Sequence, residues 1–183
     1  SKVSEGVLTA QRFGGEHFFE MSELAVKTGA YLAKLLQVED AQIVSSASAG
    51  IAQSVAAVIG QGSSFHLYHP YSEKIQRREI ILPKGHNVDY GTPVEVMVQQ
   101  GGGQVVEAGY ANMCSVDHIA QMISPQTAAI LYIKSHHTVQ KSMLSVKEAA
   151  QVAKQSGIPL IVDAAAEEDL FRYIQEGADL VIY

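Results

Sequence analysis

The sequence predicts an α/β fold with a mainly parallel sheet and helices on both of its faces. From about residue 100 onward, short apolar runs alternate with helical patterns, as in repeated strand–helix units. The runs are almost continuously apolar, which is typical of strands buried on both faces. Hydrophobic residues make up 47% of the 183, enough for a real core. We expect one domain over residues 1–183, incomplete at both ends because neither end looks like a domain boundary.

The elements follow in order. A helix is expected over 22–36, capped by Ser22, then a short strand over 42–44 and a helix over 51–59. An irregular stretch over 61–78 precedes a strand over 79–82, a turn over 83–87 and a helix over 93–100 that ends at three glycines. Strands over 104–107, 128–133, 158–162 and 180–183 then alternate with helices over 116–123, 146–155 and 170–175.

Composition excludes several classes of protein. A formal net charge of -6 gives no electrostatic reason to expect nucleic-acid or anionic-membrane binding. No apolar run approaches the ~20 residues of a membrane span. The single cysteine, Cys114, excludes an internal disulfide and fits a reducing, cytoplasmic setting.

Asp163 is the first candidate site residue. It ends the apolar run 158–162 and is followed by three alanines. In a parallel α/β sheet, ligands bind at the carboxyl ends of the strands, so a carboxylate there can bind a metal, a ribose or a protonated ring nitrogen. The alternative is that Asp163 caps the next helix.

The small residues between the expected strand at 42–44 and the next helix form a second candidate. Ser45 to Gly50 would leave backbone N–H groups free at a helix N-terminus, where a phosphate gains hydrogen bonds and the helix dipole. The pattern is neither a Walker loop nor GxGxxG, so a plain capped helix start is an equal alternative.

Histidines follow two further strands. His136 and His137 come after the strand over 128–133, and adjacent residues of an extended chain point to opposite sides, so we expect at most one of them to face a ligand. A zinc site would need spaced companions such as HExxH, which are missing. His86, after the strand over 79–82, could stack on a planar ligand, act as an acid or base, or lie on a surface turn.

Three segments, in this order and spacing, resemble the fold type I pyridoxal-phosphate enzymes. They are Ser45–Gly50, Lys134–His137 and Ile161–Ala166. The branch that this chain most resembles is that of bacterial selenocysteine synthase, the L-seryl-tRNA selenium transferase. Residues 110–114 and 136–139 depart from that enzyme's pattern, and these departures resemble the sister group that includes D-glucosaminate-6-phosphate ammonia-lyase.

The resemblance implies a large domain of a transferase-like enzyme that binds pyridoxal 5'-phosphate and no metal. Ala47, Ser48 and Ala49 would hold the cofactor phosphate, and Asp163 would pair with the pyridinium nitrogen. His136 would lie near the ring hydroxyl or the substrate carboxylate, and His86 would stack on the ring. The lysine that binds the cofactor covalently is expected a few residues after Tyr183.

The implied reaction removes water and ammonia from an amino-sugar acid to give a 2-keto-3-deoxy acid. The substrate is therefore a small amino acid or amino-sugar acid, and a substrate phosphate would need cations such as Lys74, Arg77 and Arg78. The family's sites imply a homodimer or larger oligomer. Two alternatives stay open: the tRNA-dependent selenium transferase and a non-catalytic α/β binding domain.

Overall fold

The computed structural model describes residues 2–183, which form two compact parts, one up to Ile43 and one from Val44 onward. The first part contains helices α1 (Glu5–Glu16) and α2 (Met21–Leu36). Ser4 caps α1, which the sequence patterns did not predict, by accepting a hydrogen bond from the Val7 amide at 3.4 Å. Ser22 does not cap α2: it lies inside the helix, and its hydroxyl donates to the Glu20 side chain at 2.9 Å.

The strand expected over 42–44 does not form. These residues follow α2 as irregular chain, and the Ile43 side chain is 65% exposed. Because so short a run becomes a strand only when it pairs with a neighbouring strand in a sheet, its apolar side chains alone did not suffice.

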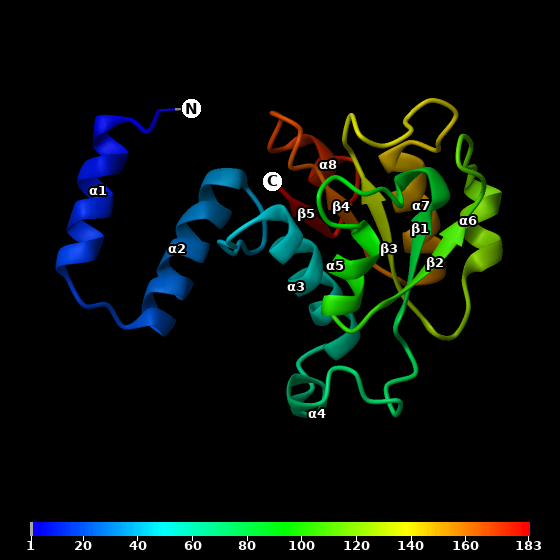
Figure 1. The fold of residues 1–183 in the computed structure, drawn as a ribbon, viewed down its shortest axis with the longest axis horizontal. Helices are drawn as coiled ribbons and strands as arrows, with labels where there is room; N and C mark the ends of the chain where they lie inside the picture. The colour runs from blue at the N-terminus through cyan, green and yellow to red at the C-terminus, as the bar shows by residue number, and fades with distance from the viewer. Residues whose placement is uncertain (1) are drawn as a thin grey trace. The chain divides into compact units, whose positions relative to one another are not determined.

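The second part holds a five-stranded, wholly parallel sheet in the order β2-β1-β3-β4-β5. Its strands are β1 (Glu79–Pro83), β2 (Gln104–Ala108), β3 (Thr127–Ile133), β4 (Leu160–Asp163) and β5 (Leu180–Ile182). Its helices are α3 (Ala47–Gly60), α4 (Ser64–Tyr68), the 3-10 turn η1 (Lys84–His86), α5 (Val94–Gln100), α6 (Val116–Met122), α7 (Val146–Ser156) and α8 (Arg172–Gln175). The predicted α/β class and the helices on both faces are therefore confirmed (Figure 1).

Alternate strand residues build two separate cores. Ile81, Tyr132 and Val162 face α6, α7 and α8, whereas Leu82, Leu131 and Ile161 face α3 and α5. Since side chains alternate along a strand, Asp163 follows Ile161 onto the α3 face of the sheet.

Local chemistry sets where the helices start and stop. Ser115 and Ser145 begin α6 and α7 with reciprocal capping boxes, the second closed by the Glu148 carboxylate. Gly157 ends α7 with a φ of 66°, which glycine adopts without steric cost. Within residues 2–183, no helix combines the length and apolarity needed to cross a membrane.

Candidate functional site

The carboxyl ends of the parallel strands bring the candidate residues to one edge of the sheet. In the register of the sheet, Ile133 lies opposite Asp163, and Asp163 lies opposite Ile182. The amide of Lys134 continues this pairing by donating to the Asp163 carbonyl at 2.7 Å. The residues that follow β1, β3 and β4 therefore share one rim, hereafter the carboxyl rim.

Asp163 is a buried carboxylate, 5% exposed. Its Oδ1 accepts a hydrogen bond from the Ala165 amide at 3.1 Å, and its Oδ2 lies 3.5 Å from the Tyr90 hydroxyl, at the long limit of a hydrogen bond. Burial raises the pKa of Asp163, although both hydrogen bonds oppose that rise. No cation forms an ion pair with it among the described residues. A buried charge without a counterion is a position suited to a cationic ligand.

Asp163 is not the cap of the next helix. The N-cap of α8 is Phe171, which makes no side-chain capping bond. Just before the helix, Asp169 Oδ1 accepts from the amides of Phe171 and Arg172 at 3.0 and 3.1 Å. The Asp163 carboxylate instead bends the chain after β4 through its bond to Ala165.

The first turn of α3 lies beside the same rim. Ser46 caps the helix by accepting from the Ala49 amide at 3.1 Å, so within the described chain the amides of Ala47 and Ser48 keep no hydrogen-bond partner. Gly50 packs closely on β5, since a Cβ there would lie 2.7 Å from Cγ2 of Ile182. Because Ile182 lies opposite Asp163, free helix amides and a buried carboxylate are set close together.

A row of three aromatic rings starts at Asp163. The Tyr90 ring, whose hydroxyl reaches Asp163, stacks on the His137 ring with centroids 5.6 Å apart and an interplanar angle of 29°. The His136 ring in turn lies on His137, with centroids 4.0 Å apart. His137 is therefore the histidine nearer to Asp163 in this row, and His136 lies further out.

His86 does not offer its ring to a ligand, contrary to the expected stacking role. It is 0% exposed, its Nε2 donates to the Val139 carbonyl at 3.0 Å, and its Nδ1 accepts from the Ile133 amide at 3.3 Å. Burial lowers the pKa of His86 to about 4. The ring is thus a neutral link between β3 and the loop that follows it.

The cations suggested for a substrate phosphate lie at the opposite edge. Arg77 and Arg78 precede β1, and their Nε atoms donate to the carbonyls of Thr127 and Ile75 at 2.9 and 2.8 Å. Arg77 thereby binds the amino end of β3, and Lys74 precedes β1 in the same segment. Their charge therefore does not reach the carboxyl rim.

Tyr90 was missed by the sequence patterns. It lies in the turn Asp89–Gly91, where the Gly91 amide donates to Asp89 Oδ1 at 2.8 Å and Gly91 has a φ of 112°. The Asp-Tyr-Gly turn shortly after β1 was the available signal, because turns after parallel strands carry site residues. Burial and the neighbouring Asp163 raise the pKa of Tyr90 to about 12.

No family model matches the sequence. A D-glucosaminate-6-phosphate ammonia lyase from Salmonella typhimurium strain 14028s is 43% identical over 183 residues, which cover 100% of this chain and 50% of that protein. A 5'-C-glycyluridine monooxygenase-decarboxylase from a Streptomyces species is 36% identical over 99% of this chain and 46% of that protein. The chain thus spans about half the length of the curated relatives it matches.

Solved structures of pyridoxal-phosphate proteins and of the same lyase share the fold of this chain. A structure of D-glucosaminate-6-phosphate ammonia-lyase superposes with a TM-score of 0.94 at 43% identity, covering 99% of this chain and 49% of the other. A pyridoxal-5'-phosphate dependent protein from Escherichia coli shares the fold, with a TM-score of 0.58 at 15% identity over 86% of this chain and 38% of its own. The chain therefore has the fold of the large domain of fold type I pyridoxal-phosphate enzymes, and its sequence is related along its whole length to that of D-glucosaminate-6-phosphate ammonia lyase.

Proposed function

We propose that this chain is the cofactor-binding part of a pyridoxal-phosphate-dependent ammonia lyase that acts on an amino-sugar acid such as D-glucosaminate 6-phosphate. The observation that carries the proposal is the 43% identity to that lyase along the entire chain. Asp163 supports it independently, because a buried carboxylate needs a cationic partner and Asp163 forms no ion pair within residues 2–183.

The residues present fit pyridoxal phosphate. Asp163 would hold the protonated ring nitrogen, and the amides of Ala47 and Ser48, with the Ser48 hydroxyl, would hold the phosphate at the N-terminus of α3. The Ala49 amide, which the sequence also suggested, already donates to the Ser46 cap. When bound, this cofactor supplies an electron sink for the electrons released at the substrate's Cα. The cationic ring would also compensate the buried charge that raises the pKa of Asp163.

The aromatic row supplies the remaining contacts. We place Tyr90 and His137 beside the ring, in the role that the sequence suggested for His86, because the Tyr90 hydroxyl lies next to Asp163 and the His137 ring stacks on Tyr90. His136, further out, would contact the substrate carboxylate. The site would be completed in a homodimer or larger oligomer, as the resemblance implies.

The proposed reaction balances without an oxidant. The Cα proton and the C3 hydroxyl leave as water, and the resulting enamine takes up one water to give a 2-keto-3-deoxy acid and ammonia. Asp163 would keep the ring nitrogen protonated through these steps. The ring could then accept the electrons released at the substrate's Cα and give them back.

The test uses the protein at full length. Its visible absorbance is recorded before and after borohydride reduction, and ammonia is then assayed with D-glucosaminate 6-phosphate. We expect a yellow protein whose colour borohydride removes, and a matching yield of ammonia and 2-keto acid. A colourless protein that takes up no pyridoxal phosphate would contradict the enzyme proposal.

A second candidate is a monooxygenase-decarboxylase, supported by the 36% identity to the glycyluridine enzyme. That activity consumes oxygen, so an oxygen electrode with 5'-C-glycyluridine distinguishes it from a lyase, which consumes none. The tRNA-dependent selenium transferase gains no support from the chain's net charge of -6. A non-catalytic binding domain would bind ligand without turnover in either assay.

A further inference from the structure

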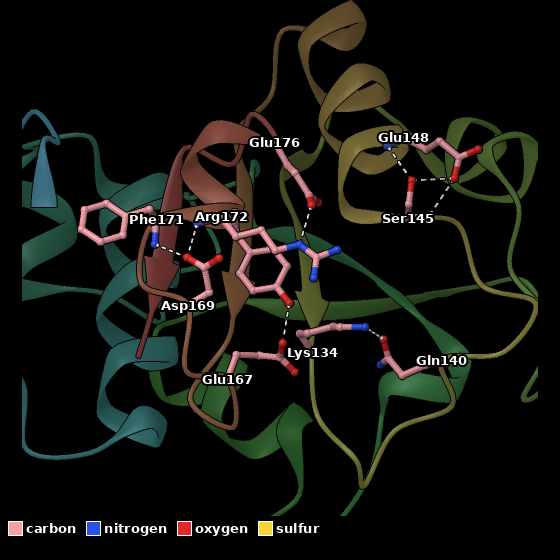
Figure 2. A network of polar contacts seen from close by, with 10 residues as sticks. Lys134, Gln140, Ser145, Glu148, Glu167, Asp169, Phe171, Arg172 and Glu176 are labelled. Atoms are coloured by element: carbon pink, nitrogen blue, oxygen red, sulfur yellow. Dashed lines mark hydrogen bonds and ion pairs between the residues drawn. The ribbon is translucent and has the colours of Figure 1, made fainter.

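A groove of about 450 Å³ lies on the other face of the sheet, at the start of α7 and α8. It is lined by Tyr132, Lys134, Ser145, Val146, Lys147, Arg172, Tyr173 and Glu176. In Figure 2, Lys134 extends toward Gln140, and the Arg172 guanidinium lies beside Glu176. Both α7 and α8 follow strands that end at the carboxyl rim, so the groove belongs to the same end of the sheet as Asp163.

Three cations and one carboxylate line this groove, which leaves an excess of two positive charges. The Nζ of Lys134 donates to the neutral Gln140 Oε1 at 2.9 Å and forms no ion pair among the described residues. Arg172 uses its Nε for Glu176 at 2.7 Å, and its terminal nitrogens keep no protein acceptor within the described chain. Lys147 is exposed at the first turn of α7. In a chain of net charge -6, two lysines without an ion pair among the described residues, together with the free end of the paired Arg172 guanidinium, favour an anion.

The start of α7 does not itself provide the site. Its capping position is filled, because Ser145 and the Glu148 carboxylate bond to each other at 2.7 and 2.8 Å. An anion in the groove would therefore be held by the side chains of Lys134, Lys147 and Arg172. The planar guanidinium and two ammonium groups match the ~2 negative charges and three oxygens of a phosphate monoester.

Lys134 connects the groove to the candidate site. Its amide bonds to the Asp163 carbonyl at 2.7 Å, while its side chain follows Tyr132 to the α7 face and Asp163 follows Ile161 to the α3 face. The two sites thus flank the carboxyl end of β4.

We propose that this groove binds the phosphate monoester of the substrate while the reacting end of the same molecule lies on the Asp163 side. This inference rests on the proposed function. The phosphate of a separate effector molecule would bind through the same side chains. Kinetic measurements distinguish such an effector from the substrate.

The experiment measures ammonia release by the full-length holoenzyme from D-glucosaminate 6-phosphate and from D-glucosaminate. The variants are Lys134→Gln, Lys147→Gln and Arg172→Gln, with Lys154→Gln at the far end of α7 as the matched control. We expect Lys134→Gln and Arg172→Gln to lower the kcat/KM preference for the phosphorylated substrate at least tenfold, through KM, and Lys147→Gln to lower it less. Lys154→Gln should keep the wild-type preference.

Other outcomes overturn the inference. The inference fails if folded Lys134→Gln and Lys147→Gln variants keep the wild-type kcat/KM preference for the phosphorylated substrate. It also fails if inorganic phosphate activates the enzyme without competing with the substrate. Because Arg172→Gln also removes the Glu176 ion pair, its thermal midpoint is measured alongside. If wild type releases no ammonia from either substrate, the proposed function has failed, and inorganic phosphate then tests the groove alone. A rise in the thermal midpoint of wild type, absent in Lys134→Gln, would support an anion site there, and no rise in wild type would reject it.

Discussion

Asp163 is buried, and its burial opposes the ionisation of its carboxyl group. The carboxylate is 5% exposed, and its burial raises its pKa because two hydrogen bonds do not compensate the lost hydration. A group of this kind reduces stability until a cationic ligand pairs with it. Binding and stability should therefore respond in opposite directions when it is changed.

We predict this divergence for Asp163→Asn. Since the folded-state pKa of Asp163 lies above its ordinary value, ionisation opposes folding, and the free energy of unfolding falls as pH rises through the interval between the two values. At pH 7 the cofactor-free Asn variant should be at least as stable as wild type, while its affinity for pyridoxal phosphate falls about tenfold or more. Thermal unfolding and absorbance titration measure the two effects. Asp117→Asn, in the exposed first turn of α6, is the control; a variant that keeps wild-type affinity would contradict the assignment.

His86 is expected to make stability fall as pH falls, whereas Asp163 makes it fall as pH rises. Its pKa falls from 6.5 to about 4, so the unfolded chain takes up a proton before the native chain does, and stability is lost as pH falls from 6.5 to 4. That loss is on the order of 3 kcal/mol. In His86→Gln, urea unfolding should lose this part of its pH dependence, and in the exposed His69→Gln control it should persist. Identical pH profiles for wild type and His86→Gln would disprove the role.

At the scale of elements, a close approach of α3 to the end of α5 fixes one face of the sheet. A Cβ at Gly101 would overlap the Ala52 carbonyl oxygen and lie 2.8 Å from Cβ of Val55. Gly101 has a φ of -78°, so its backbone alone would accept any residue. Glycine is required there by packing and not by conformation.

Gly101→Ala should therefore destabilise the protein by about 1–3 kcal/mol, because helix backbone has to move to admit one methyl group. Chemical denaturation measures the change. Gly15→Ala, at a position in α1 with no atom within 4 Å, is the matched control and should stabilise slightly, by up to about 1 kcal/mol. Equal effects of the two substitutions on the free energy of unfolding would show that the space between Gly101 and α3 admits a methyl group.

At the scale of the whole molecule, the chain between α2 and α3 is the natural place for a first cut. Residues 38–45 carry no regular secondary structure, and the boundary between the two compact parts falls within them. Brief digestion with a glutamate-specific protease should cleave first after Glu39, because a protease needs an extended and accessible segment. Mass spectrometry of the earliest fragments identifies the site. An initial cut after Glu148, which is exposed but lies within α7, would contradict the prediction.

The elements that could be predicted from the sequence were those determined by residues close together in the chain. Ala128 to Ile133 reads as a buried strand from its unbroken apolar run, and the helix expected over 146–155 forms as α7. Residues 42–44 carry a similar apolar pattern yet form no strand, because strand formation also depends on a pairing partner elsewhere in the chain.

The same division holds for the site. The sequence by itself determined the alternation of strands and helices, and with it the edge at which the residues after β3 and β4 lie, His136 and Asp163 among them, because parallel strands end on one side. No strand precedes α3 in the described chain, so its first turn reaches this edge only through the packing of Gly50 on Ile182. Only the tertiary structure decided that His86 is buried between hydrogen-bond partners, that Tyr90 reaches Asp163, and that Lys134 and Arg172 line one groove. Those facts depend on side chains from distant segments packing together, and no local pattern encodes such contacts.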